Sequence, residues 1–272
     1  MVFLILGIIL TLIGVFLLTW SKKAAGKSMS IASTDITDTR NLLETYESMS
    51  NAHGTGHFNM YVKLYGKAYA DKPLIAEYSK SECIYYSIKV DREYEAVETK
   101  TDKEGKVTQQ RVRRFENVLD KEFYAPGFAV HDQYGRIRIS HNNAKLETIE
   151  SYATFEREES QEKIRLPFNF EGLIRDHSGA EGRTIGYKHM ERSIPVGYNL
   201  FVVGTATDSR GELEIAKANE ADKPFLISIK SEAEIMADLI RSSKRSKGWG
   251  YGLIGIGLAG LIFGILQKMG LF

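Results

Sequence analysis

The sequence is poor in cysteine, in proline and in net charge, and each shortage excludes a class of protein. Its 272 residues contain one cysteine, Cys83, which excludes an internal disulfide and a zinc site built on several cysteines. Five prolines leave no proline-rich linker that would divide the chain. A formal net charge of +1 gives no support for nucleic-acid binding, which usually needs a clearly basic face.

Recognisable catalytic motifs are also absent. The sequence has no Gly-x-Ser-x-Gly elbow, no complete phosphate-binding loop and no His-Glu-x-x-His motif. The nearest candidate for a metal pair is His53 with His57, but the two glycines between them disfavour the helix that would align both rings. Cys83 lies in an alternating, β-like run, where a structural thiol is a better interpretation than a nucleophile. We therefore predict no cofactor and assign no catalytic residue.

Long uncharged runs lie at both ends of the chain. The first is 19 residues long and ends at Trp20; as a helix it would rise about 28 Å, enough for a hydrocarbon core. The second starts at Trp249 and extends to Leu266. Both tryptophans lie at the inner end of a run, where indole rings settle at a membrane interface. We predict transmembrane helices at residues 1–21 and 248–267, and a lipid bilayer as partner.

Basic residues predict the orientation of these helices. Only Lys268 lies on the terminal side of the two runs. The side of the central region has seven basic residues: Lys22, Lys23, Lys27, Arg241, Lys244, Arg245 and Lys247. The positive-inside rule therefore predicts a two-pass protein with a cytoplasmic central domain and both termini outside, the reverse being the alternative. The first run lacks the basic start of a cleaved signal peptide, so we expect a retained anchor.

Small residues recur at four-residue spacing in the second run, for example at Gly260 and Gly264. Small side chains let helix backbones approach closely in lipid. Two interpretations stay open: packing against the first helix, and self-association into a homo-oligomer.

The region between the runs predicts one strand-rich domain. Residues 22–57 form a juxtamembrane segment with an amphipathic helix that Asp35 can cap. Over residues 58–247, apolar and polar residues alternate as in half-buried strands, for instance from Ile84 to Val90. Three Asp-x-x-Gly turns predict hairpins: Asp102–Gly105, Asp132–Gly135 and Asp208–Gly211. We predict an α+β protein, mainly antiparallel β, with a hairpin-rich sheet or small barrel between the terminal helices.

One cluster of basic residues could bind a ligand. Arg111, Arg113 and Arg114 form a basic patch in a β-like run. Arginines in such a run more often form a solvated face, so the cluster alone identifies no ligand. An acidic run around Glu156 to Glu162 is best explained as exposed surface.

A set of short segments carries a family resemblance. In chain order they include Gly66-Lys67-Ala68, Cys83-Ile84-Tyr85-Tyr86, Phe128 to Asp132, Gly186-Tyr187, Glu191-Arg192, Ile194 to Gly197, Leu200 to Gly204, Gly211-Glu212-Leu213 and Pro224 to Ser228. This ordered set resembles the GIDE family, over about Phe58 to Leu271. Its best-known member is an E3 ubiquitin ligase of the mitochondrial outer membrane.

The resemblance implies a ligase-related function and a folded domain beside a membrane. It also reveals a departure, because the ligase continues past its second membrane helix into a RING domain that holds two zinc ions. Here only Gln267 to Phe272 follow that helix, and none of them is a cysteine. Since tetrahedral zinc needs four ligands, we expect no RING, no metal and no ubiquitin transfer by this chain.

These observations favour a membrane-tethered, non-catalytic interaction or scaffold module, of bacterial or related origin, over an enzyme. The partner expected from the resemblance is a small membrane-associated protein of the LemA type. Alternatives are a component of an E3 ligase activity whose RING or conjugating partner acts in trans, and an unrecognised membrane-bound hydrolase. A lipid-facing role is another alternative, because Lys244, Arg245 and Lys247 could attract anionic headgroups.

Overall fold

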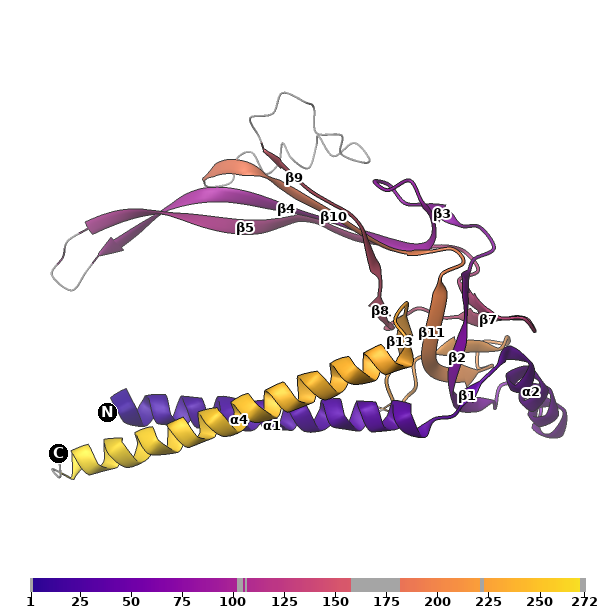
Figure 1. Ribbon diagram of the computed structural model, residues 1–272, viewed down its shortest axis with the longest axis horizontal. Helices are drawn as coiled ribbons and strands as arrows, with labels where there is room; N and C mark the ends of the chain where they lie inside the picture. Colours follow the sequence, from indigo (N-terminus) through magenta and orange to yellow (C-terminus); the bar gives the residue numbers. More distant parts are fainter. Residues whose placement is uncertain (1, 102–104, 106, 158–181, 221–222, 270–272) are drawn as a thin grey trace. The chain divides into compact units, whose positions relative to one another are not determined.

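Figure 1 shows the computed structural model of the protein. It describes residues 2–101, 105, 107–157, 182–220 and 223–269. The predicted α+β class, mostly antiparallel strands with long helices at the two ends, is confirmed. The chain divides into two compact units. Unit 1 comprises Met1–Tyr65, Ser140–Leu146 and Leu200–Phe272, and unit 2 comprises Gly66–Ile139 and Glu147–Asn199.

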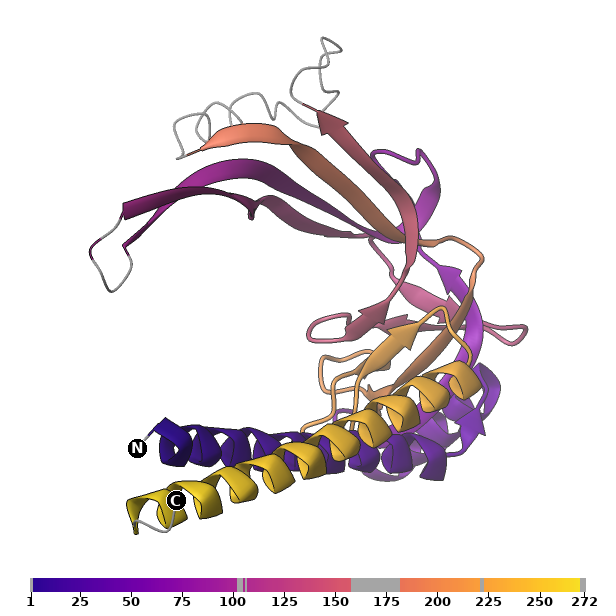
Figure 2. The same ribbon diagram turned by 60° about the vertical axis from the view of Figure 1, so that its left-hand side comes forward.

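The terminal helices of unit 1 are α1 (Val2–Ser33) and α4 (Glu232–Lys268), which lie side by side and antiparallel (Figures 1 and 2). Both are long and apolar enough to cross a membrane, and both continue past the predicted spans into the polar part of the chain. Ser231 and Glu234 begin α4 with a reciprocal capping box, which satisfies otherwise unpaired backbone amides. From this cap, α4 continues without a break into the second apolar run.

A shorter helix, α2 (Thr39–His53), follows in unit 1. Its N-cap is Asp38, whose carboxylate accepts a hydrogen bond from the amide of Asn41 at 2.7 Å. The expectation that Asp35 caps this helix is therefore wrong. Asp38 has the extended backbone of an N-cap residue, with φ −106° and ψ 170°, and this conformation presents its side chain to the first turn.

The strands of unit 1 pack against the inner ends of α1 and α4. β1 (Ile36–Thr37) pairs in parallel with β2 (Asn59–Tyr69), and β11 (Asn199–Thr207) pairs with β12 (Glu214–Ala216) and β13 (Leu226–Ser228). β8 (Lys145–Glu147) neighbours β13. The core cluster of this unit joins strand and helix side chains: Ile31, Phe201, Val203, Leu226 and Ile235. The inner ends of α1 and α4 are thus held by burial of apolar area.

Unit 2 is built around a five-stranded antiparallel sheet. Its strands are β3 (Leu74–Ile75), β4 (Glu82–Thr101), β5 (Val107–Tyr124), β9 (Ile149–Arg157) and β10 (Arg183–Pro195). β4 lies between β5 and β10, and β9 pairs with the other edge of β10. β4 and β5 form the long hairpin of Figure 2. A second hairpin, β6 (Ala129–His131) with β7 (Arg136–Ile139), pairs with the end of β2.

The three predicted hairpins are confirmed, since β4–β5, β6–β7 and β11–β12 are all antiparallel pairs. In the second turn, the Asp132 carboxylate accepts from the amides of Tyr134 and Gly135 at 2.8 and 3.2 Å. In the third, Gly211 has a φ of 92° and its amide donates to the Asp208 carbonyl at 2.9 Å. Residues 102–104 of the first turn lie outside the described residues.

Candidate functional site

The contact between α1 and α4 follows a seven-residue repeat of small side chains. The residues of this seam are Gly7, Gly14 and Ser21 on α1, and Ser243, Gly250, Gly257 and Gly264 on α4. A Cβ atom on Gly7 would lie 2.8 Å from the Gly257 carbonyl oxygen, so the two backbones approach too closely for any side chain there. At the inner end, the Ser21 hydroxyl donates to the Ser243 carbonyl at 3.0 Å. A seven-residue period keeps one seam facing the partner helix along the whole pair.

The predicted packing glycines lie on or beside this seam. Gly264 packs against Leu4, where an added Cβ would come within 2.8 Å, and Gly260 is in ordinary contact with Gly7 and Phe3. The other glycines of the four-residue pattern face away from α1, because a Cβ on Gly248, Gly252 or Gly255 would meet nothing within 4 Å.

The residues predicted to lie at a membrane interface cluster along the helix pair. Trp20 is 57% exposed and Trp249 is 66% exposed. The neighbouring basic residues are also exposed: Lys22, Lys23, Lys244, Arg245 and Lys247. Ser21 contacts Ser243, so these two residues lie at the same height along the helix pair. The basic residues of α1 and α4 lie within about two helical turns of that height. The pair therefore has one basic band, between the apolar runs and the strands.

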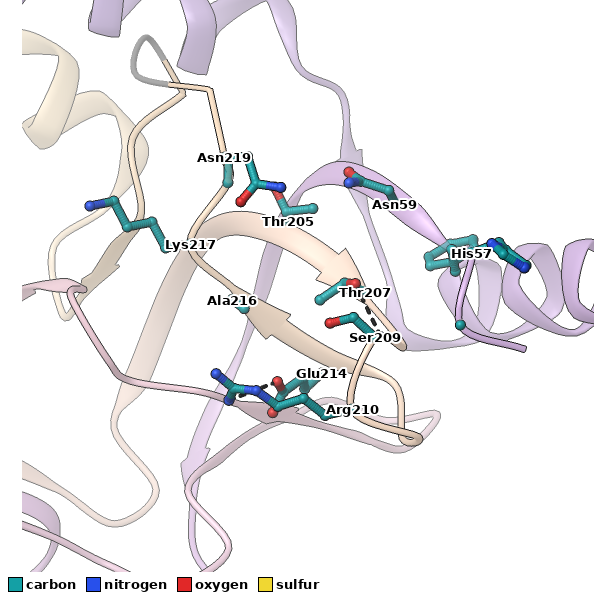
Figure 3. Close-up of a pocket in the computed structure, with 13 residues that line it drawn as sticks. His57, Asn59, Thr205, Thr207, Ser209, Arg210, Glu214, Ala216, Lys217 and Asn219 are labelled. Carbon is teal, nitrogen blue, oxygen red and sulfur yellow. Dashed lines mark hydrogen bonds and ion pairs between the residues drawn. The ribbon is translucent and has the colours of Figure 1, made fainter. Parts of the chain in front are cut away.

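A polar pocket of about 330 Å³ opens on the strands of unit 1 (Figure 3). Thr205 and Thr207 of β11 face this pocket. They follow Phe201 and Val203 on the same face of the strand, and those two side chains are buried against the helices. The wall that carries His57 is fixed by the buried carboxylate of Asp208. That carboxylate accepts from the amides of Gly56 at 2.7 Å and Phe58 at 2.9 Å.

Hydrogen-bonding groups dominate the chemistry of this pocket. Thr205 is 4% exposed, and its hydroxyl has no hydrogen-bond partner among the described residues. Arg210 is engaged by Glu214 at 3.1 Å and by the Ser140 hydroxyl at 2.8 Å. No group of three His, Cys, Asp or Glu side chains in the described parts of the chain could hold a metal. The geometry suits binding of a polar group.

The two histidines considered as a metal pair have different surroundings. His57 lines the pocket in Figure 3, whereas His53 ends α2 and is not among the lining residues. The glycines between them adopt positive φ angles, 82° at Gly54 and 91° at Gly56, so the segment is not helical.

The arginines of the basic patch point to two faces of the sheet in unit 2. Because side chains alternate along β5, Arg111 and Arg113 share one face and Arg114 lies on the other. Arg113 forms an ion pair with Glu93 at 3.2 Å, and Arg114 forms one with Glu98. The glutamate also raises the pKa of Arg114.

The structure adds two arginines that sequence reasoning missed. Arg183 of β10 is opposite Glu95, which is opposite Arg113 of β5, so these three side chains form one row across the sheet. Arg157 of β9 is opposite Gly186 in the next row. Strand register alone brings these residues together, and no local signal in the sequence indicates it.

A buried polar network joins β10 to the loop after β3. The fully buried Glu191 carboxylate accepts from the amides of Tyr78 at 2.6 Å and Ser79 at 3.2 Å. His189 lies 2.9 Å from the Tyr78 hydroxyl through Nδ1. Burial lowers the pKa of His189 to about 4 and raises that of Tyr78, so the tyrosine donates to a neutral imidazole.

Cys83 is also buried, and burial raises the pKa of its thiol to about 11. The thiol therefore stays protonated at neutral pH, which is a poor state for a nucleophile.

Comparison with known proteins gives one family-level match. A family model described as "E3 Ubiquitin ligase" matches residues 95–264, which is more than half of the chain. The matched range starts in β4 and includes most of α4. No curated protein and no solved structure matches the chain significantly. The resemblance drawn from the short sequence segments is confirmed.

Proposed function

The chain belongs to the GIDE family, and from this membership we propose that it is a membrane-tethered interaction module in a ligase-related process. Its own role is to hold a partner near the membrane, and ubiquitin transfer is left to another chain. These 272 residues contain one cysteine and so cannot by themselves supply the several thiolates that the zinc sites of a RING domain need.

The helix pair is the observation that carries the proposal. Its apolar residues point outward: Leu12 is 64% exposed, Phe16 59%, Ile256 62% and Ile262 60%. In a core helix of a soluble protein such side chains would be buried, whereas the seam between α1 and α4 is occupied by glycine and serine. Lipid can cover this apolar area, which in water would cost roughly 25 cal/mol per Å².

The basic band supports an orientation. Lys22, Lys23, Lys244, Arg245 and Lys247 all lie on the side of the helix pair nearer to the strands. By the positive-inside rule, both units face the cytoplasm and both termini face outward. In inverted vesicles, protease should then cleave the central region. Cleavage from the outer face of intact cells alone would contradict this orientation.

Membrane insertion itself is tested by extraction with alkaline carbonate. We expect the chain to stay in the pellet and to be released only by detergent. Recovery of a monodisperse protein from the carbonate supernatant would refute the tether.

The interaction role is tested by crosslinking in native membranes, followed by mass spectrometry. We propose a small membrane-associated helical protein of the LemA type as the partner, and expect one protein to be recovered repeatedly. A broad range of proteins would argue against a dedicated partner.

A second candidate function, support of a ligase acting in trans, is favoured by the description of the matched family. With a charged conjugating enzyme, the purified chain alone should transfer no ubiquitin. Adding a separate RING protein should increase modification of a bound partner if this second function holds. Transfer by the chain alone would overturn the non-catalytic role.

A further inference from the structure

We propose that one face of the five-stranded sheet in unit 2 is a docking surface for an acidic segment of a partner protein. This arginine face is defined by Arg111 and Arg113 of β5, Arg157 of β9, Arg183 of β10, and the rings of Phe115 and Phe155. It deepens the proposed interaction role by naming the chemistry of the partner, and it does not depend on the membrane tether.

Strand register brings these side chains to one face. Arg113, Glu95 and Arg183 are opposite one another on β5, β4 and β10. The next row runs across β5, β4, β10 and β9, in that order. Its members are Phe115, Glu93, Gly186 and Arg157. Residues directly opposite in a sheet point to the same side, so both rows belong to one face. Arg111, opposite Val97, extends this face toward the tip of the hairpin.

The charges of this face are mixed, with basic residues in excess. In the four rows from Arg111 to Lys188, the basic residues are Arg111, Arg113, Arg157, Arg183 and Lys188, and the acidic residues are Asp91, Glu93 and Glu95. The carboxylates lie between arginines, as in the row Arg113–Glu95–Arg183. A uniformly anionic surface such as a lipid bilayer would meet these carboxylates as well as the arginines, which weakens its attraction to the face. A chain with separated acidic side chains can meet the arginines individually, which favours a peptide segment.

Two exposed rings supply apolar contacts beside the arginines. Phe115 is 69% exposed and Phe155 is 41% exposed. The ring of Phe155 lies against Gly186, because a Cβ built there would come within 2.8 Å of its Cζ atom. Aromatic and arginine side chains are the residue types most enriched at protein interfaces.

The surface is hollowed beside Arg183. One hollow of about 410 Å³ is lined by Arg113, Phe155 and Arg157 among others, and one of about 480 Å³ by Arg111 and Val97. Arg183 and Glu95 line both hollows. A bound segment could therefore place side chains on either side of Arg183 while it lies along the sheet.

The test uses the full chain in an uncharged detergent and a fluorescent eight-residue peptide of alternating glutamate and leucine. Anisotropy should show saturable binding that weakens as salt is added. Arg113→Gln should weaken binding about tenfold, which corresponds to loss of about 1.4 kcal/mol. Arg183→Gln, in the same row, should have a similar effect.

Arg114→Gln is the matched control. Arg114 is on the same strand, is one residue away and also loses one ion pair, but it lies on the opposite face. Its substitution should leave affinity within about twofold of wild type. Thermal unfolding of each variant verifies that the fold is retained.

Three results would overturn the proposal. If Arg113→Gln and Arg114→Gln weakened peptide binding equally, the attraction would be non-specific and electrostatic. If the peptide did not bind at all, this face would not be a docking surface for acidic segments. Binding of vesicles with phosphatidylserine in place of the peptide would assign the face to a membrane. Carbonate extraction, measured separately, reports on the tether and distinguishes its failure from a failure of this surface.

Discussion

At the scale of single residues, the buried His189 couples the stability of unit 2 to pH. Its pKa is lowered from the ordinary 6.5 to about 4 by burial, so folding favours the neutral imidazole. Stability from this residue is complete above pH 6.5 and is lost as pH falls from 6.5 toward 4, because only the unfolded chain takes up the proton in that window.

We therefore expect the free energy of unfolding of wild type to fall between pH 7 and pH 5, and to fall less in His189→Gln. Urea unfolding in detergent at both pH values measures the difference. His57→Gln, which removes an exposed histidine, serves as control and should keep the wild-type dependence. Identical pH dependence in wild type and His189→Gln would contradict the prediction.

Two threonines of the pocket in Figure 3 give a paired prediction. Thr205 has a buried hydroxyl without a partner among the described residues, whereas the Thr207 hydroxyl accepts from the Ser209 amide at 3.3 Å. Thr205→Val should raise the free energy of unfolding by about 1 kcal/mol, and Thr207→Val should lower it by about 1 kcal/mol. Chemical unfolding curves of the two variants and of wild type measure these changes in the free energy of unfolding. Equal destabilisation by both would show that the Thr205 hydroxyl is satisfied in solution.

At the scale of elements, the seam between α1 and α4 depends on glycine at specific positions. Gly257→Leu should destabilise the helix pair by about 1–3 kcal/mol, because its Cβ would meet the Gly7 carbonyl oxygen at 2.8 Å. Gly252→Leu, on the same helix, should have little effect, since a Cβ there meets nothing within 4 Å.

Thermal unfolding in detergent, combined with a disulfide crosslink between cysteines introduced into α1 and α4, reads out this difference. If Gly252→Leu were the more damaging substitution, the four-residue face would be the one that packs, as in self-association of α4.

At the scale of the whole molecule, the helices extend beyond the band that we propose lies at the bilayer. From Trp20 to Ile31, where α1 enters the core of unit 1, the helix rises about 16 Å. With the proposed tether, the strands of unit 1 would be held off the membrane surface on two helices that each continue without a break.

Both tryptophans of the chain lie in this band, which permits a test of the tether. In vesicles of brominated lipid, most tryptophan fluorescence should be quenched, because the proposed tether brings Trp20 and Trp249 into contact with the lipid. Quenching of about half the signal would place one tryptophan in water and contradict a two-pass arrangement.

Several features follow from the sequence alone. The uncharged runs ending at Trp20 and beginning at Trp249 indicate helices without knowledge of any partner, because hydropathy and length are local properties. The Asp-x-x-Gly turns predict hairpins for the same reason, since aspartate and glycine set the backbone within four residues.

Only the tertiary structure decided which residues meet across elements. The sequence placed Arg111, Arg113 and Arg114 in one patch, and the strand register divided them between two faces and added Arg183. The glycine seam and the buried Thr205 hydroxyl likewise depend on contacts between segments far apart in the chain. Such contacts are set by strand register and side-chain packing. A shift of one residue in register moves every side chain of a strand to the other face of the sheet, and no local sequence pattern specifies which register is adopted.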